Sequence, residues 1–210
     1  MKYLDVNSWN RKEHFHFFNQ FSDPFFGVTI SMDVTNAYAF SKKCKYSFFI
    51  VYLHACMKAI NAIENFRYRI KDDKVLIYER IDVSPTILRP NQTFGFSYVF
   101  FDKDLKVFNH NFQQEKERVL SSNQLFPPIN QENCVYCSAL PWLHFSAQKE
   151  PMIHFNNNSI PKLSFGKFKN NDGKLEMPVS IIVNHALMDG IHLAQFFERY
   201  QKELNSFSYH

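Results

Sequence analysis

Glycine is scarce in this chain, with only 5 in 210 residues. A phosphate-binding loop needs several glycines at fixed spacing, and neither GxGxxG nor GxxxxGK[ST] occurs. The sequence therefore argues against a Rossmann oxidoreductase and a P-loop kinase. Long apolar runs are also lacking, so we expect no signal peptide and no membrane-spanning segment, and we predict a cytoplasmic protein.

The chain also lacks a strong charge of either sign, since its formal net charge is only +4. Lys42, Lys43 and Lys45 form the one tight basic group. We interpret these lysines as solvated loop charge, with a landing site for a small anionic ligand as the alternative. Because there is no basic stripe and no reader motif, nucleic-acid binding is not expected.

Cysteine is limited to four positions, of which Cys134 and Cys137 make a CxxC pair. No second ligand pair accompanies them, and both belong to an apolar, strand-like run. We interpret them as structural thiols and predict no metal site.

Apolar residues make up 45% of the chain, and 24 residues are Phe, which is enough for a sizeable core. Apolar side chains at helical spacing predict a buried helix over 49–63 and an amphipathic helix from Leu193 to Leu204. Apolar runs predict strands at 94–101, 134–140, 161–168 and 176–184, and Ser8 is positioned to cap a short helix. Strands and helices alternate without a composition break, so we predict one layered α/β domain over residues 1–210.

The segment over residues 183–192, VNHALMDGIH, carries the best candidate for chemistry. His185 ends a β-branched run, and Asp189 and Gly190 form a turn before the last helix. A histidine at the end of a buried strand can project into a cleft, and an imidazole with a pKa of about 6.5 accepts protons near neutral pH. From the spacing alone, a structural histidine remains the other interpretation.

Six blocks resemble the chloramphenicol acetyltransferase family, in its order and near its spacing. The segment around His185 is similar to the family's HHAxxDGFH signature. The other five blocks are WNRKEHF at 9–15, NFRYRIKD at 65–72, TF at 93–94, SALPW at 138–142 and SFGKF at 164–168. The resemblance implies a two-layer α/β sandwich with a mixed β-sheet and helices packed on it. It also implies a homotrimer with active sites between subunits.

The resemblance implies acetyl transfer from acetyl-CoA, as co-substrate, to an alcohol held in the same site. His185 would be the general base, and Ser138 would donate a hydrogen bond to the oxyanion. Asp189 and Arg11 would form an ion pair that supports the loop of the base. Ser164 stands where the family has a threonine whose hydroxyl holds a water near the intermediate.

Two further sets of residues follow from the resemblance. The first set would bind the acceptor, chloramphenicol, and consists of aromatic residues: Phe17, Phe18, Phe26, Phe94 and Phe126. The second set would lie near the coenzyme A channel and consists of Lys167, Trp142 and Phe168. For Trp142 and Phe168, core packing is an equally good interpretation.

The chain also departs from the family pattern. Asn184 replaces the first histidine of the pair, Ile182 a glutamine, and Ile191 an aromatic residue. Phe18 stands where a tyrosine would bind the antibiotic, and Met152 stands where a valine is expected. Glu150 falls at an apolar pocket position, where an unpaired carboxylate is costly. Either Glu150 points elsewhere or the acceptor differs.

Three alternatives to a chloramphenicol acetyltransferase stay open. The first is an O-acetyltransferase of the same fold that acts on a different alcohol. The second is the acyltransferase core of a 2-oxoacid dehydrogenase complex, whose motif is similar but which normally carries lipoyl and peripheral-binding segments. The third is a non-catalytic binding protein, against which His185 and Ser138 argue.

Overall fold

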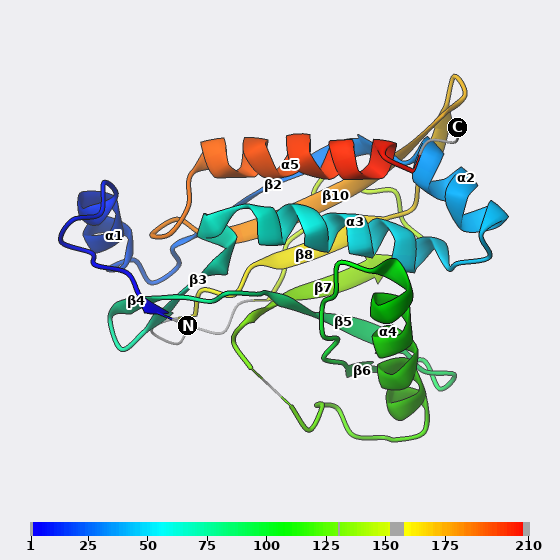
Figure 1. Cartoon of the computed structure of the whole chain (residues 1–210), viewed down its shortest axis with the longest axis horizontal. Helices are drawn as coiled ribbons and strands as arrows, with labels where there is room; N and C mark the ends of the chain where they lie inside the picture. Colours follow the sequence, from blue (N-terminus) through cyan, green and yellow to red (C-terminus); the bar gives the residue numbers. More distant parts are fainter. Residues whose placement is uncertain (1, 130, 152–157, 208–210) are drawn as a thin grey trace.

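The computed structural model describes residues 2–129, 131–151 and 158–207, so Met152 lies outside the described residues. Figure 1 shows the helices and strands along the chain and labels most of them. In the first half these are β1 (Lys2–Tyr3), α1 (Lys12–Phe18), β2 (Phe25–Asp33), α2 (Thr35–Lys43), α3 (Phe48–Ala62), the 3-10 helix η1 (Glu64–Arg67), β3 (Tyr68–Lys71), β4 (Lys74–Ile77), β5 (Asp82–Leu88) and β6 (Phe94–Phe96). In the second half they are α4 (Leu105–Leu120), β7 (Cys134–Leu140), β8 (Lys162–Gly166), β9 (Lys169–Asn171), β10 (Lys174–Asn184) and α5 (Gly190–Asn205).

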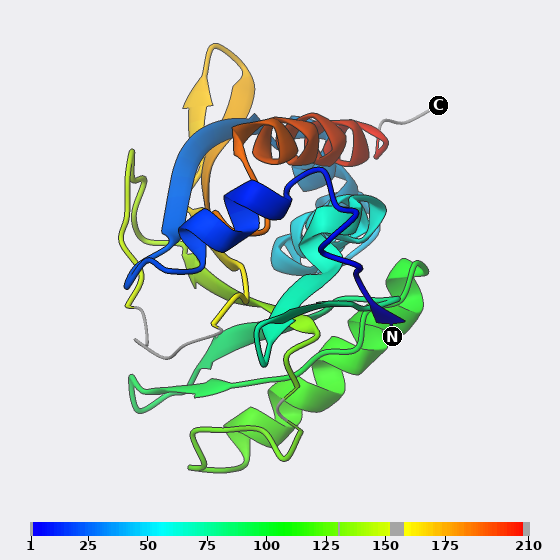
Figure 2. The same cartoon turned by 90° about the vertical axis from the view of Figure 1, so that its left-hand side faces the viewer.

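A mixed sheet forms one layer of the fold, with strand order β2-β10-β8-β7-β5-β6 and β9 paired to β10. Strand β7 runs parallel to both β5 and β8, while β10 runs antiparallel to β2 and β8. Helices α3 and α5 cover one face of this sheet (Figures 1 and 2). The predicted class, an α/β layered fold with a mixed sheet, is confirmed.

Burial explains why the sequence forms these elements. Ten of the fifteen residues of α3 are buried, because neighbouring elements surround this helix. Helix α5 buries a single stripe that includes Leu193, Phe196 and Tyr200, as its amphipathic spacing predicted. Strand β10 is buried from Met177 to Asn184, which accounts for its continuous apolar run.

Some local predictions were wrong. Helix α1 begins at Lys12, and the hydroxyl of Ser8 donates to Asp5 instead of capping it. The strand expected over 94–101 is short, since β6 ends at Phe96. Lys42 and Lys43 occupy the last turn of helix α2 rather than a loop, where positive charge suits the negative end of the helix dipole.

Strand β2 comes unusually close to β10 at Gly27. A Cβ atom at Gly27 would lie 2.6 Å from the carbonyl oxygen of Ile181 and 2.8 Å from the side chain of Ile182. Glycine therefore allows the two strands to meet beside the C-terminal end of β10, where His185 follows.

Across the described part of the chain, no helix combines the length and the apolar character required to cross a membrane.

Candidate active site

His185 is held by main-chain atoms at the end of β10. Its N–H donates to the carbonyl of Pro24 at 2.8 Å, and its ring Nδ1 lies 3.0 Å from the carbonyl oxygen of Met188. A carbonyl only accepts, so Nδ1 carries the proton and donates. In the neutral ring, Nε2 is then the free proton acceptor.

Two aromatic rings fix the plane of this imidazole. Phe18 stacks on His185 with ring centroids 3.9 Å apart and planes 7° apart, and Phe26 lies at 4.3 Å with planes 36° apart. The side chain of His185 remains 31% exposed. The ring is therefore ordered but still accessible to a substrate.

Arg11 and Asp189 form an ion pair next to the imidazole of His185. The guanidinium of Arg11 is ion-paired with Oδ2 of Asp189, and its Nη2 donates to the carbonyl of His185 at 2.9 Å. The other carboxylate oxygen of Asp189, Oδ1, lies 3.1 Å from Nδ1 of His185. Arg11 is only 6% exposed, and burial lowers its pKa. The pair thus joins helix α1, the end of β10 and the start of α5.

Two supporting residues were not identified from the sequence. Asn184 is buried; its amide donates to the carbonyl of Asn158 at 3.0 Å and accepts from the N–H of Ala186 at 2.9 Å. His192 accepts the N–H of Asp189 on its Nδ1 at 2.8 Å. Asn184 was noted only as a departure from the family pattern. Its place immediately before the candidate base was the available signal.

A row of hydroxyl groups crosses the sheet at one register. Ser138 is opposite Ser164, Ser164 is opposite Ser180, and Ser180 is opposite Thr29. Register partners point to the same face of a sheet. The neighbours of Ser180 in β10, Val179 and Ile181, belong to the buried core, so the row lies on the face opposite the helices.

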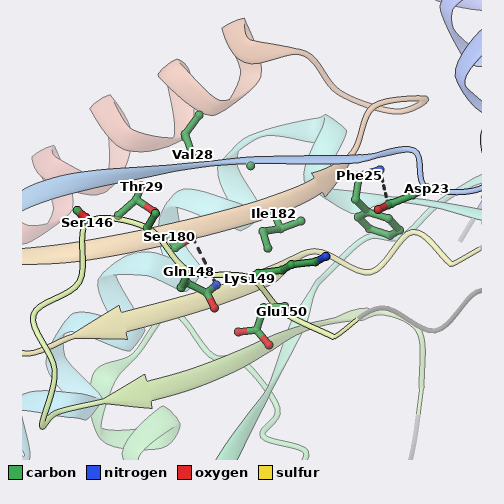
Figure 3. Close-up of a pocket in the computed structure, with 12 residues that line it drawn as sticks. Asp23, Phe25, Val28, Thr29, Ser146, Gln148, Lys149, Glu150, Ser180 and Ile182 are labelled. Atoms are coloured by element: carbon green, nitrogen blue, oxygen red, sulfur yellow. Dashed lines mark hydrogen bonds between the residues drawn. The ribbon is translucent and has the colours of Figure 1, made fainter.

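A covering segment over residues 146–150 lines an open cavity of about 290 Å³ together with Thr29 and Ser180 of this row. Figure 3 shows Gln148 pointing toward Ser180 of β10, with Lys149 and Glu150 following on the same covering segment. Glu150 accepts a hydrogen bond from the hydroxyl of Ser164 at 2.6 Å, and Gln148 lies 3.5 Å from that of Ser180. Glu150 thus faces the hydroxyl row.

His185 and Ser138 of one chain are far apart. Ser180 is the register neighbour of Ser164. His185 follows Ser180 by five residues, just past the end of β10, which is about 16 Å at the rise of an extended strand. Ser138 is two strands away from β10, which adds about 10 Å across the sheet. One acceptor hydroxyl cannot contact both side chains within a single chain.

The five candidate acceptor residues form two groups. Phe18 and Phe26 contact the ring of His185, and Phe17 packs on Phe18 with ring centroids 5.1 Å apart. Phe94 and Phe126 both contact the ring of Phe96. Because β2 and β6 are the two edges of the sheet, about 24 Å separates the groups. Phe17, Phe94 and Phe126 are 58%, 45% and 58% exposed.

The candidate coenzyme A residues follow the ends of β7 and β8. Trp142 is 62% exposed, and Lys167 is exposed next to Gly166. Phe168 is half-buried against Tyr38 and Phe48, with ring centroids at 5.1 and 5.7 Å. Core packing therefore accounts for Phe168, whereas Trp142 and Lys167 are open to a ligand.

Cys134 and Cys137 of the CxxC pair do not point to a common site. Residues three apart in a strand point to opposite faces, and both thiols are buried. Burial raises the pKa of Cys134 to about 12 and raises that of Cys137 as well. Within residues 2–129, 131–151 and 158–207, no group of three His, Cys, Asp or Glu could hold a metal ion.

Comparisons with known proteins point to one family. The chloramphenicol acetyltransferase family matches residues 1–201. Chloramphenicol acetyltransferase 3 of Escherichia coli is 30% identical over 205 residues, which cover 97% of this chain and 96% of that protein. The chloramphenicol acetyltransferase of Bacillus pumilus is 31% identical over 199 residues, with 94% and 90% covered.

Solved structures show the same fold. A chloramphenicol acetyltransferase superposes with a TM-score of 0.86 at 27% identity, covering 97% of this chain and 99% of its own. The dihydrolipoamide acetyltransferase of Azotobacter vinelandii superposes with a TM-score of 0.70, covering 93% and 88%. Its identity is only 17%, so that likeness concerns the fold alone.

Proposed function

This chain belongs to the chloramphenicol acetyltransferase family of acyltransferases, and we propose that it transfers the acetyl group of acetyl-CoA to a hydroxyl of chloramphenicol. The observation that carries the proposal is the contact of His185 Nδ1 with the carbonyl oxygen of Met188 at 3.0 Å. Because Nδ1 donates to the carbonyl of Met188, Nε2 is available to accept the proton of an acceptor hydroxyl.

In the proposed reaction, Nε2 of His185 removes the hydroxyl proton while the oxygen attacks the thioester carbonyl. A tetrahedral oxyanion forms, and the hydroxyl of Ser138 donates a hydrogen bond to it. The oxyanion then collapses, the C–S bond breaks, and the imidazolium returns its proton to the leaving thiolate of coenzyme A. No acyl-enzyme is formed, because both substrates are held together.

We propose that residues 1–210 act as one domain within a homotrimer. The separation of His185 from Ser138 supports this, because a neighbouring copy has to supply one of the two. The two distant aromatic groups support it too, since Phe94 and Phe126 of one copy and Phe18 and Phe26 of another would enclose the acceptor. Large aromatic side chains exposed on one chain are typical of such an interface.

We place coenzyme A along Trp142 and Lys167, whose exposed indole and ammonium suit its adenine and phosphates. We also propose a cytoplasmic location. Four free thiols fit a reducing compartment, and acetyl-CoA is made there.

The test of the proposed function is thiol release from acetyl-CoA across a chloramphenicol titration, with the product identified by mass. We expect release that depends on the drug and a singly acetylated product. Turnover of some other alcohol without acetylation of chloramphenicol at millimolar concentration would favour an acetyltransferase of the same fold with a different acceptor. Two features favour that second candidate: the absent hydroxyl at Phe18 and the carboxylate of Glu150.

A further inference from the structure

Glu150 places a carboxylate beside the proposed oxyanion site. Its Oε1 accepts a hydrogen bond from the hydroxyl of Ser164, which is fully buried and opposite Ser138 in the sheet. Adjacent strands are about 4.8 Å apart and the hydrogen bond from Ser164 to Glu150 adds 2.6 Å, so this carboxylate lies within about 7 Å of the Ser138 hydroxyl that would bind the oxyanion. The single donor of Ser164 is thereby directed to Glu150 instead of to an intermediate.

The cavity does little to neutralise Glu150. No Lys, Arg or His nitrogen of the described residues lies within the 4.0 Å of an ion pair. The charge of Lys162 acts on Glu150 from a distance, while its ammonium donates to the carbonyl of Pro151. Burial lowers the pKa of Lys162, and the charge of Glu150 raises it in part. Asp23 and Lys149 line the same cavity with opposite charges, so among the described residues Glu150 is offset only by the charge of Lys162, without an ion-pair contact.

A negative charge at this place opposes the reaction of a neutral acceptor. At about 7 Å and an effective dielectric constant between 20 and 40, the repulsion of an oxyanion corresponds to a rate loss of about 5–50-fold. An acceptor that brings a positive charge to the cavity would cancel this repulsion. It would also provide a partner for the free lone pairs of the carboxylate.

We infer that Glu150 is a specificity-determining residue that selects alcohols with an ammonium group close to the reacting hydroxyl. The inference rests on the proposed acetyl transfer. It names the class of acceptor alcohol that this chain should prefer and that an enzyme with an apolar residue at position 150 should not. Chloramphenicol, which is neutral, is then a slower acceptor than an otherwise matched cationic alcohol.

The experiment compares two acceptors that differ at one group. The first is chloramphenicol, and the second is the analogue in which a dimethylamino group replaces the dichloroacetamide. The tertiary amine is protonated at neutral pH and cannot itself keep an acetyl group. Three proteins are compared, alongside a surface control: the native protein, Glu150→Gln and Glu150→Asp. Glutamine can still accept the hydrogen bond of Ser164 but carries no charge, whereas aspartate keeps the charge.

We expect Glu150→Gln to raise kcat/KM for chloramphenicol by about 5–50-fold and to lower the preference for the ammonium alcohol by at least about 5-fold. Glu150→Asp should retain the native preference. Glu117→Gln, which removes an exposed carboxylate on α4, is the matched control and should change neither value. An unchanged ratio of the two kcat/KM values in Glu150→Gln would overturn the inference while leaving the proposed function intact.

Binding provides a second readout that does not require turnover. The dissociation constants of both alcohols are measured by calorimetry on native protein and on Glu150→Gln. If neither alcohol is acetylated, the proposed function fails, yet the inference about Glu150 is still decided. Loss of preferential binding of the ammonium alcohol in Glu150→Gln supports it, and equal preference in the two proteins refutes it.

Discussion

Removing either charge of the Arg11–Asp189 pair should destabilise the protein and misplace the base. Arg11 is almost fully buried, and its guanidinium contacts both the carboxylate of Asp189 and the carbonyl of His185. Breaking a fully buried pair costs about 3–5 kcal/mol, but the carboxylate side chain is 32% exposed. Water can partly solvate an abandoned Asp189, so we expect about 2–3 kcal/mol for Arg11→Gln.

The measurement is a double-mutant cycle of Arg11→Gln and Asp189→Asn, by urea unfolding at one protein concentration. Fixed concentration matters because the stability of an oligomer depends on it. We expect a coupling energy of at least about 1 kcal/mol, and a fall of roughly 5–10 °C in Tm for each single variant. Glu117→Gln serves as the surface control. Single effects that add to within about 0.5 kcal/mol would refute the reasoning, because residues in contact should couple.

Four further outcomes are expected. His185→Ala should lower turnover by about 10²–10⁴-fold with an unchanged circular dichroism spectrum. Near-native turnover of this variant would exclude His185 as the general base. Phe18→Tyr should lower KM for chloramphenicol several-fold, since a neutral hydrogen bond contributes about 0.5–1.5 kcal/mol; an unchanged KM would mean that the ring does not contact the drug. Light scattering should give a trimer, and a fully active monomer would contradict the shared site. Burial, followed by the charge of Arg11, lowers the pKa of His192 below 6.5 in the folded state. Its contribution to stability should be complete above about pH 6.5 and be lost as the pH falls through the lowered value; His192→Gln should flatten this loss in urea titrations.

The sequence predicted the helices and strands that have an extended pattern of apolar residues. Helix α3 was expected over 49–63 and occupies Phe48–Ala62, and the strand expected over 134–140 is β7. Strand β5 and helix α2 were not predicted. Strand β5 contains Pro85, which normally argues against an inner strand, and α2 has only a weak apolar stripe. Tertiary contacts determine such short elements more than their local pattern does.

The candidate site was likewise predictable from the sequence only in part. A motif within ten residues indicated His185, and it placed Asp189 beside the base. The hydrogen bond between Glu150 and Ser164 joins a covering segment to a strand, so strand periodicity could not reveal it. Nor could the motifs show that Ser138 and His185 of one chain lie too far apart to act together. That separation follows from the strand order, which a single sequence does not display.

The arrangement around His185 explains why departures from the family pattern can be accommodated there. Main-chain carbonyls of Pro24 and Met188 hold the backbone and the ring of the base. Carbonyls are present whatever the side chains are, so these two contacts place no demand on residue type. Asn184 is buried and keeps both a donor and an acceptor engaged, as a polar side chain there has to. The chemical demand therefore falls on Arg11 and Asp189, whose charged groups contact the carbonyl and the ring of His185.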